Sequence, residues 1–194
     1  LDRSIPYLSE ESTPSSYASR REWQRFWLVD PLDGTTNFCL EVPFYCVSVG
    51  LWRNNSPLLG AVLEIPSNRL FTGIVGVGAW CNEIPIKVNV ERPGDYSKAV
   101  FCTGLPVAFE YSKDNIQKLI TACRCFGKVR MLGSAALMLC YVALGRCDSY
   151  WESQIALWDV GAALAIVQAA GGVTRHGNIG GNLRMDVEAA SCES

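Results

Sequence analysis

The stretch WLVDPLDGTTNF, residues 27–38, ends an apolar run with two aspartates, Asp30 and Asp33. Residues 26–29 predict a short strand. Gly34 supplies backbone freedom after it, and Thr35 or Thr36 can cap a following helix. Two neighbouring carboxylates repel each other unless a cation lies between them, and carboxylate oxygens suit Mg²⁺ or Mn²⁺. By itself the stretch also fits an ordinary acidic turn with a helix cap, because short motifs often match by chance.

Two further acidic features follow or open apolar segments. Glu10 and Glu11 come after the apolar residues 5–8, and Asp159 opens the apolar helix predicted at 158–170. Each acid has a simpler role when taken singly, and Asp159 could act only as a helix cap. Taken together, three acidic segment ends around one apolar core could supply a cage of carboxylates for metal ions. Helix-start N–H groups beside such a cage suit phosphate.

The composition is that of a globular protein. The 194 residues are 49% hydrophobic and 19% charged with a net charge of −2, so they carry no basic excess of the kind that marks nucleic-acid or membrane-surface binding. No apolar run reaches the length of a membrane span, and no secretory signal is recognisable. Because the chain begins at Leu1, we expect a fragment or a processed chain.

The cysteine and histidine content limits the kinds of site. The nine cysteines form no C-x-x-C pair, which favours buried thiols in a reducing compartment, and we therefore expect a cytoplasmic protein. The single histidine, His176, excludes a zinc site that needs two histidines. It lies in a Gly/Asn-rich segment, where we expect a solvent-exposed loop.

The order of elements predicts a layered α/β fold. Strands are expected at 26–29, 43–52, 58–65, 70–75, 99–103 and 148–151, a glycine-rich turn region at 76–85 and a loop at 14–21. Helices are expected from a cap at Ser112 to about residue 126, at 134–144 and at 158–170. An antiparallel meander followed by alternating strands and helices favours stacked layers over a barrel. We expect two halves, 1–98 and 99–194, that fold as one unit with the active site between them.

Several motifs together resemble the inositol monophosphatase family of metal-dependent, lithium-sensitive phosphatases. The opening stretch resembles its D-P-(I/L)-D-G-T-x-N-F signature, and LWDVGAALAIVQAAGG resembles its W-D-x-(A/G)-A-G region. SEES resembles an acidic G-E-E-S segment, LGSAALMLCYVALGRCDSYWE a substrate-side G-(S/T)-A-A-L region, and GVGAWCNEIPIKV a G-x-G-A-x-x-N-G segment in which Glu83 replaces the usual glycine. The resemblance implies an alternating α/β/α/β/α sandwich, here without its first helical layer.

The resemblance also implies a metal site for two or three Mg²⁺ ions. Glu10, Asp30 and the backbone carbonyl of Leu32 would hold the first ion. Asp30, Asp33 and Asp159 would hold the second, and a third, weaker ion would lie near Glu10. A metal lowers the pKa of its bound water, and paired metals stabilise both oxygens of an in-line displacement.

The remaining implied roles concern water and substrate. Thr35 and Glu10 would orient the water and help to deprotonate it, with Asp33 counted among the catalytic groups. The N–H groups of Gly34 and Thr35 would receive phosphate, and Glu152 would bind substrate hydroxyls. The neighbouring wall would consist of Gly133, Ser134 and Ala135.

The resemblance implies a phosphomonoesterase that acts on a small polyol phosphate, most simply inositol monophosphate. The T-T-N-F ending and the C-T-G-L-P stretch at 102–106 favour this branch. The L-S-E-E segment and the W-Q-R-F-W-L-V-D-P-L-D-G run instead resemble 3′(2′),5′-bisphosphate nucleotidases. An inactive metal-binding homologue with a regulatory or structural role is the third alternative. The family resemblance implies a homodimer. The composition and charge predict neither a nucleic-acid nor a membrane partner.

Overall fold

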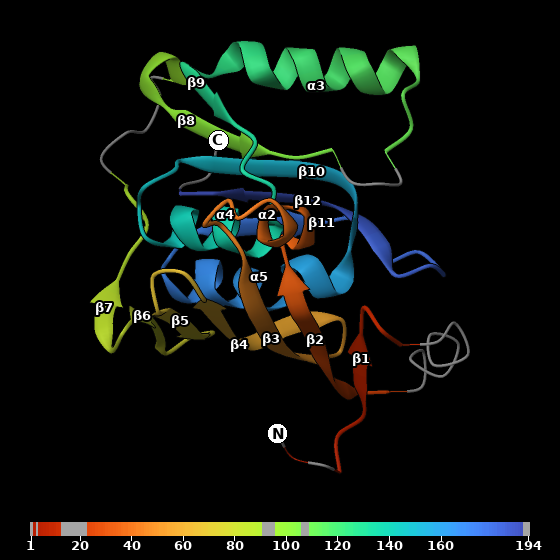
Figure 1. Cartoon of the computed structure of the whole chain (residues 1–194), viewed down its shortest axis with the longest axis vertical. Coiled ribbons are helices and arrows are strands. Elements are labelled where there is room, and N and C mark those ends of the chain that lie inside the picture. The colour runs from red at the N-terminus through yellow and green to blue at the C-terminus, as the bar shows by residue number, and fades with distance from the viewer. Residues whose placement is uncertain (1, 3, 13–22, 91–95, 106–108, 192–194) are drawn as a thin grey trace.

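The computed structural model describes residues 2, 4–12, 23–90, 96–105 and 109–191, which form two sheets with helices between and above them (Figure 1). The first sheet has the order β1-β2-β3-β4-β5-β6-β7, parallel between β1 and β2 and antiparallel elsewhere. Its strands are β1 Tyr7–Ser9, β2 Arg25–Asp33, β3 Cys46–Arg53, β4 Ser56–Glu64, β5 Arg69–Ile74, β6 Gly78–Cys81 and β7 Ile84–Ile86. This confirms the predicted meander.

The second sheet follows the first along the chain and has the order β11-β12-β10-β8-β9. Its strands are β8 Val100–Thr103, β9 Lys128–Arg130, β10 Ser149–Ala156, β11 Val173–His176 and β12 Arg184–Ala190. The helices are α2 Thr35–Cys39, α3 Lys113–Cys125, α4 Ala135–Ala143 and α5 Leu157–Ala169, with a short 3₁₀ helix at Tyr96–Lys98.

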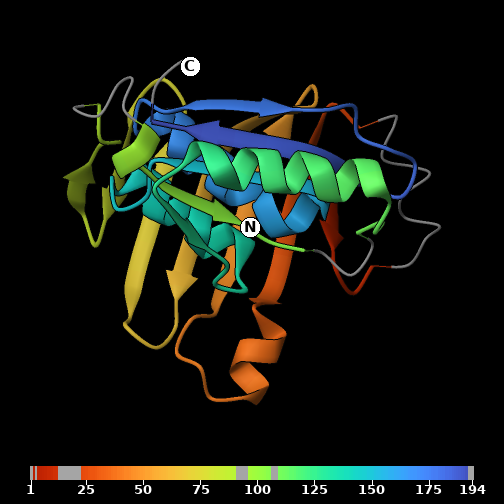
Figure 2. The same ribbon diagram turned by 90° about the horizontal axis from the view of Figure 1, so that it is seen from above.

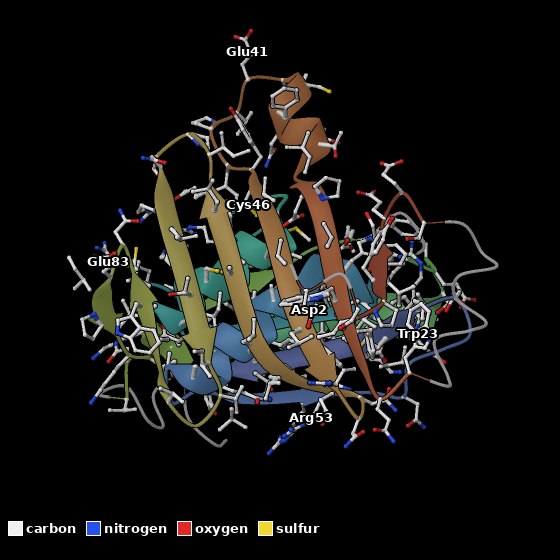
Figure 3. The ribbon with its side chains drawn as sticks, turned by 90° about the horizontal axis from the view of Figure 1, so that it is seen from below. Asp2, Trp23, Glu41, Cys46, Arg53 and Glu83 are labelled. Atoms are coloured by element: carbon white, nitrogen blue, oxygen red, sulfur yellow. The ribbon has the colours of Figure 1, made fainter. Side chains whose placement is uncertain are left out.

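Helices α4 and α5 lie between the two sheets, and α3 lies on the far side of the second sheet (Figures 1 and 2). Every residue of α4 except Tyr141 is buried, as expected for a helix that is apolar all round. In α3 the Ser112 side chain accepts a hydrogen bond from the N–H of Asn115, which confirms the predicted cap. Figure 3 shows the outer face of the first sheet, which no helix of the described residues covers. The layered α/β sandwich is confirmed.

A row of glycines brings α5 directly onto the first sheet. Gly50, Gly60 and Gly73 are paired in register across β3, β4 and β5 and are all buried. A Cβ atom on Gly50 or Gly73 would lie 2.8 or 2.7 Å from backbone atoms of α5, and one on Gly60 would lie closer still to the carbonyl of Ala162. The helix therefore rests on the backbone of three strands. We call these three residues the glycine row.

Several predicted boundaries were wrong. Residues 76–85, expected as a turn region, contain β6 and most of β7, and β10 runs five residues beyond the predicted end at Trp151. His176 is the last residue of β11 rather than a loop residue, and its half-buried ring lies 5.4 Å from that of Trp52. The loop predicted at 14–21 lies outside the described residues.

The turn between β6 and β7 provides a stability prediction. Asn82 and Glu83 have φ values of 46° and 68°, a left-handed pair typical of two-residue hairpin turns. Glycine adopts this conformation without steric cost, whereas the exposed Glu83 gains nothing from its Cβ. We expect Glu83→Gly to raise Tm by about 1–3 °C, because roughly 0.5–1 kcal/mol of strain is removed.

Thermal unfolding of three proteins checks this expectation. Glu83→Ala is the control, because it removes the same charge and keeps the Cβ atom. A rise in Tm in the alanine variant equal to that in the glycine variant would assign the effect to charge and contradict the backbone explanation.

Candidate active site

Asp33 links the end of β2 to the start of α4. Its Oδ2 atom accepts hydrogen bonds from the Ser134 hydroxyl at 2.6 Å and from the Ala136 N–H at 2.8 Å. The register between β2 and β3 shifts between Asp30 and Asp33, so a bulge re-aims the strand end at this point. Because Oδ2 is committed to the helix, Oδ1 is the oxygen that can face a ligand.

The turn after Asp33 is held by its own side chains. The N–H of Leu32 donates to Asp30 Oδ1 at 2.9 Å, and the Thr35 hydroxyl donates to the Leu32 carbonyl at 2.9 Å. Gly34 has φ 90°, a left-handed conformation in which a Cβ would lie 2.9 Å from the carbonyl oxygen of Phe44. Leu32, predicted as a metal ligand, and Thr35, predicted to orient the water, are therefore in direct contact.

The residues predicted as a substrate wall lie beside this turn. Asn37 donates from Nδ2 to the carbonyls of Phe44 and Leu132, both at 2.8 Å, and so joins the turn to the segment that precedes α4. A Cβ on Gly34 would lie 3.3 Å from the carbonyl oxygen of Gly133. Ser134 caps α4 and is buried, and its hydroxyl is bound to Asp33. The Ser134 hydroxyl thus supports the aspartate.

Glu152 approaches the same region from the second sheet. It lies in β10 with only 4% of its surface exposed, and the Tyr150 hydroxyl donates to its Oε2 at 2.8 Å. Gly104 allows this close packing, since a Cβ there would lie 2.5 Å from Oε2. Oε1 is then the atom of Glu152 that can accept from a ligand.

The carboxyl groups act on one another electrostatically. Burial, followed by the charge of Asp33 and a smaller contribution from Glu10, raises the pKa of Asp30 to about 7. Burial raises the pKa of Asp33 to about 6, although hydrogen bonds from Ser134 and α4 oppose the rise.

Asp159 and Glu152 belong to the same group, and Glu10 joins it through the effect of its charge on Asp30. Burial and then the charges of Asp33, Asp30 and Glu10 raise the pKa of Asp159 well above its usual value. Burial and the charge of Asp33 raise the pKa of Glu152 to about 7. We call the group that consists of Glu10, Asp30, Asp33, Glu152 and Asp159 the acidic centre.

The donor chemistry of the acidic centre fits a hard divalent cation, because all its side chains end in carboxylate oxygens that repel one another. The positions of these side chains fit a bound cation less well than their chemistry does. Among the residues that the structure describes, no three His, Cys, Asp or Glu side chains converge closely enough to hold a metal ion. Glu10 is exposed, and Oδ2 of Asp33 is committed to α4. Metal binding by the whole set would therefore require carboxylate movement.

The raised pKa values predict how stability depends on pH. An unfolded aspartate titrates near pH 3.9, about three units below the folded pKa of Asp30, which is about 7. Between these values the folded state binds more protons, so the metal-free protein loses stability as pH rises from about 4 to 7. We expect a lower Tm at pH 8 than at pH 5.5 in a chelator, and a larger increase with Mg²⁺ at pH 8.

The Asp30→Asn variant is the control for this pH dependence. Its amide does not titrate, so the difference in Tm between the two pH values should shrink in the chelator. An unchanged pH dependence in this variant would show that other groups cause it.

Three supporting residues were not predicted from the sequence as part of the site. The buried Cys46 thiol lies 3.8 Å from both Asp33 Oδ2 and the Ser134 hydroxyl. Tyr150 orients Glu152, and Asn37 joins the two motifs. Asn37 could have been identified from the sequence, since it belongs to the motif at residues 27–38. Cys46 is a lone thiol in an apolar strand, and Tyr150 stands two residues before an acid. Neither pattern indicates a role in a site.

A cavity of about 700 Å³ lies elsewhere, between α3 and the second sheet. Its lining includes Phe101, Trp151 and residues of α3 but none of the acidic centre. It is therefore separate from the candidate active site.

None of the helices in the described part of the chain has both the length and the apolar character that crossing a membrane requires.

Comparison with known proteins gives one consistent family. The model of the inositol monophosphatase family matches residues 3–192. The chain is 36% identical to bovine inositol monophosphatase 1 over 172 residues, which are 86% of this chain and 61% of that relative. It is 39% identical to Nus factor SuhB of Pasteurella multocida over 153 residues, 76% of this chain and 55% of the relative. The chain thus spans about three fifths of the curated relatives it matches.

Solved structures give the same result for the fold. The inositol monophosphatase of Anabaena superposes with a TM-score of 0.82 at 33% identity, covering 96% of this chain and 73% of the other. SuhB of Mycobacterium tuberculosis superposes with a TM-score of 0.82 at 28% identity, covering 98% and 72%. Both similarities extend over nearly all of this chain.

Proposed function

Because the chain belongs to the inositol monophosphatase family, we propose that its acidic centre hydrolyses phosphate monoesters of small polyols, with inositol monophosphate as the leading substrate. The observation that carries this proposal is the position of Asp33. One carboxylate oxygen holds the start of α4, and Asp33 directly precedes the Gly34–Thr35 turn and exerts the largest charge effect of any acid on Asp159. A phosphate-binding turn would thus adjoin a site for cations.

We propose that the acidic centre binds two or three Mg²⁺ ions. Glu10, Asp30 and the Leu32 carbonyl would hold one ion, Asp30, Asp33 and Asp159 a second, and a third would lie near Glu10. Bound Mg²⁺ supplies an acidified water and offsets the charge of the phosphoryl group. Burial and then mutual repulsion raise the pKa of Asp30 and Asp159, and such cations would stabilise the ionised form of both groups.

Thr35 and Glu10 have complementary roles in handling water. The Thr35 hydroxyl donates its hydrogen bond to the Leu32 carbonyl, so its oxygen would act as an acceptor toward a water. This fixes the direction from which that water presents its lone pair. Glu10 is exposed at the turn after β1, where its carboxylate can take up the water proton and release it to solvent. The backbone N–H groups of Gly34 and Thr35 would bind phosphate oxygens.

Glu152 is the proposed contact for substrate hydroxyls. Tyr150 occupies its Oε2 atom, so Oε1 would accept from a polyol hydroxyl. The wall formed by Gly133, Ser134 and Ala135 would contribute backbone groups, because the Ser134 hydroxyl is bound to Asp33.

A substrate panel tests the proposed activity. We expect Mg²⁺-stimulated phosphate release, faster from inositol 1-phosphate than from 3′-phosphoadenosine 5′-phosphate. A strong preference for the nucleotide would support the bisphosphate nucleotidase alternative, which the W-Q-R-F-W-L-V-D-P-L-D-G run favours. No release from any ester would support a regulatory or structural homologue, an alternative that the Nus factor name of one relative favours.

Three accompanying properties are proposed, the first and third from the family resemblance and the second from the cysteine content and charge. Lithium should inhibit by replacing a weakly held Mg²⁺, and unchanged turnover in millimolar lithium would count against this. The protein should act in the cytoplasm without a nucleic-acid or membrane partner. It should form a homodimer, which sedimentation of the intact protein would detect.

A further inference from the structure

A residue between Glu152 and Asp159 has an unfavourable backbone conformation. Gln154 has φ 58°, in the left-handed region that residues other than glycine seldom adopt. The register between β10 and β12 shifts between Glu152 and Ile155, so Gln154 lies in a bulge. A non-glycine residue remains in such a conformation only when its surroundings hold it there.

Asp186 of β12 holds this bulge. Its Oδ1 atom accepts hydrogen bonds from the Ser153 hydroxyl at 2.7 Å, the Gln154 N–H at 3.0 Å and the Gln154 side-chain amide at 3.3 Å. Arg184, two residues earlier on the same strand, donates from Nη1 to the Gln154 carbonyl at 2.9 Å. Both backbone polar groups of Gln154 are therefore bound by side chains of β12.

The residue before β12 also holds the start of α5. The N–H of Leu157 donates to the Leu183 carbonyl at 2.9 Å, and Leu183 is buried with φ 58°. The connection from Glu152 to Asp159 is therefore bound at its bulge and at the first turn of the helix. Bulges beside active sites commonly re-aim a side chain. Here the side chain just before the bulge is Glu152.

We propose that Asp186 is a positioning residue that fixes the orientation of Glu152 relative to Asp159 and so determines which polyol phosphates the site accepts. This inference rests on the proposed function, in which Glu152 contacts substrate hydroxyls. Asp186 acts from an exposed position on β12 through the backbone of Gln154. Asp159 lies on α5, which is packed in the core. Loss of Asp186 should therefore displace Glu152, the proposed substrate contact, more than Asp159, the proposed metal ligand.

The first test compares amide hydrogen exchange in the intact protein and its variants. Asp186→Ala should increase exchange at residues 153–157, and Asp186→Asn should preserve most protection, because its Oδ1 can still accept. Glu188→Ala is the matched control, since Glu188 is an exposed acid two residues further along β12. Unchanged exchange in Asp186→Ala would overturn the proposal.

The second test separates positioning from general stabilisation. Asp186→Ala should raise KM for inositol 1-phosphate by about 5- to 20-fold while kcat stays within about twofold, because substrate binding rather than chemistry is lost. Adding Gln154→Gly should restore KM, since glycine adopts the left-handed conformation unaided. Equal losses in kcat and KM, or failure of the double variant to recover, would contradict a positioning role.

Failure of the proposed function would be recognised separately. If the wild-type protein releases no phosphate, that function is wrong, and calorimetric titration with inositol 1-phosphate then reports affinity without interference from turnover. Weaker binding by Asp186→Ala that Gln154→Gly restores would support the positioning role. Equal affinity in wild type and Asp186→Ala, or no binding by either, would overturn it.

Discussion

Asp33→Asn is expected to lower Mg²⁺-dependent phosphate release by about 100- to 1000-fold without unfolding the protein. The amide oxygen can still accept the hydrogen bonds from Ser134 and Ala136, so the start of α4 remains held. The amide nitrogen then takes the place of the oxygen that faces the acidic centre. A donor there cannot bind a cation, and it removes one of the charges that raise the pKa of Asp159.

Asp33→Ala is the informative comparison. It leaves the Ser134 hydroxyl and the Ala136 N–H without their shared acceptor in a buried position, at a cost of about 1–3 kcal/mol for each group. We therefore expect both variants to be inactive, with Tm of the asparagine variant at or above that of metal-free wild type and Tm of the alanine variant several degrees lower.

Circular dichroism melts in a chelator, together with phosphate-release assays in excess Mg²⁺, measure the two effects separately. Phosphate release at the wild-type rate in Asp33→Asn would refute the role of this carboxylate in the site. Equal Tm in the asparagine and alanine variants would show that the hydrogen bonds to α4 contribute little.

The largest loss of stability is expected from Gly60→Ala. The added methyl group would meet the backbone carbonyl of Ala162 in α5, which cannot move without displacing the whole helix. Overpacking of this kind costs about 3 kcal/mol or more and should lower Tm by roughly 6–12 °C. The Mg²⁺ concentration for half-maximal activity should also rise, because α5 carries Asp159.

Two further variants define this effect. Gly181→Ala is the control, because its Cβ would have no atom within 4 Å, and its Tm should stay close to that of the wild type. Combining Gly60→Ala with Ala162→Gly should not restore stability, since the clash involves the carbonyl of residue 162 rather than its methyl group. Rescue by this double variant would show that α5 approaches the sheet through side chains.

The sequence contained enough to predict the meander, the cap of α3 at Ser112 and the helices that became α4 and α5, because their apolar patterns are local. The strand β12 was not predicted, although Met185, Val187 and Ala189 alternate with exposed residues along it. The polar residues after Glu152 interrupted the pattern of β10, and the structure places a bulge there.

The sequence predicted the residues of the candidate site within each motif, but it did not predict the contacts between motifs. Sequence order brought Asp30, Asp33 and the turn together, whereas the approach of Asp159 and Glu152 depends on packing between the sheets. The hydrogen bonds of Asp33 to α4 join residues 101 and 103 positions apart. No local pattern specifies such contacts.

The glycine row limits which chimeras of two relatives can fold. Its three members lie in residues 1–98, and the helix they receive lies in residues 99–194. One apolar core includes residues of both parts. We propose that these parts fold as one unit. A chimera that takes each part from a different relative would then have to match the strand register on one side to the helix surface on the other, so the two parts would have to be inherited together.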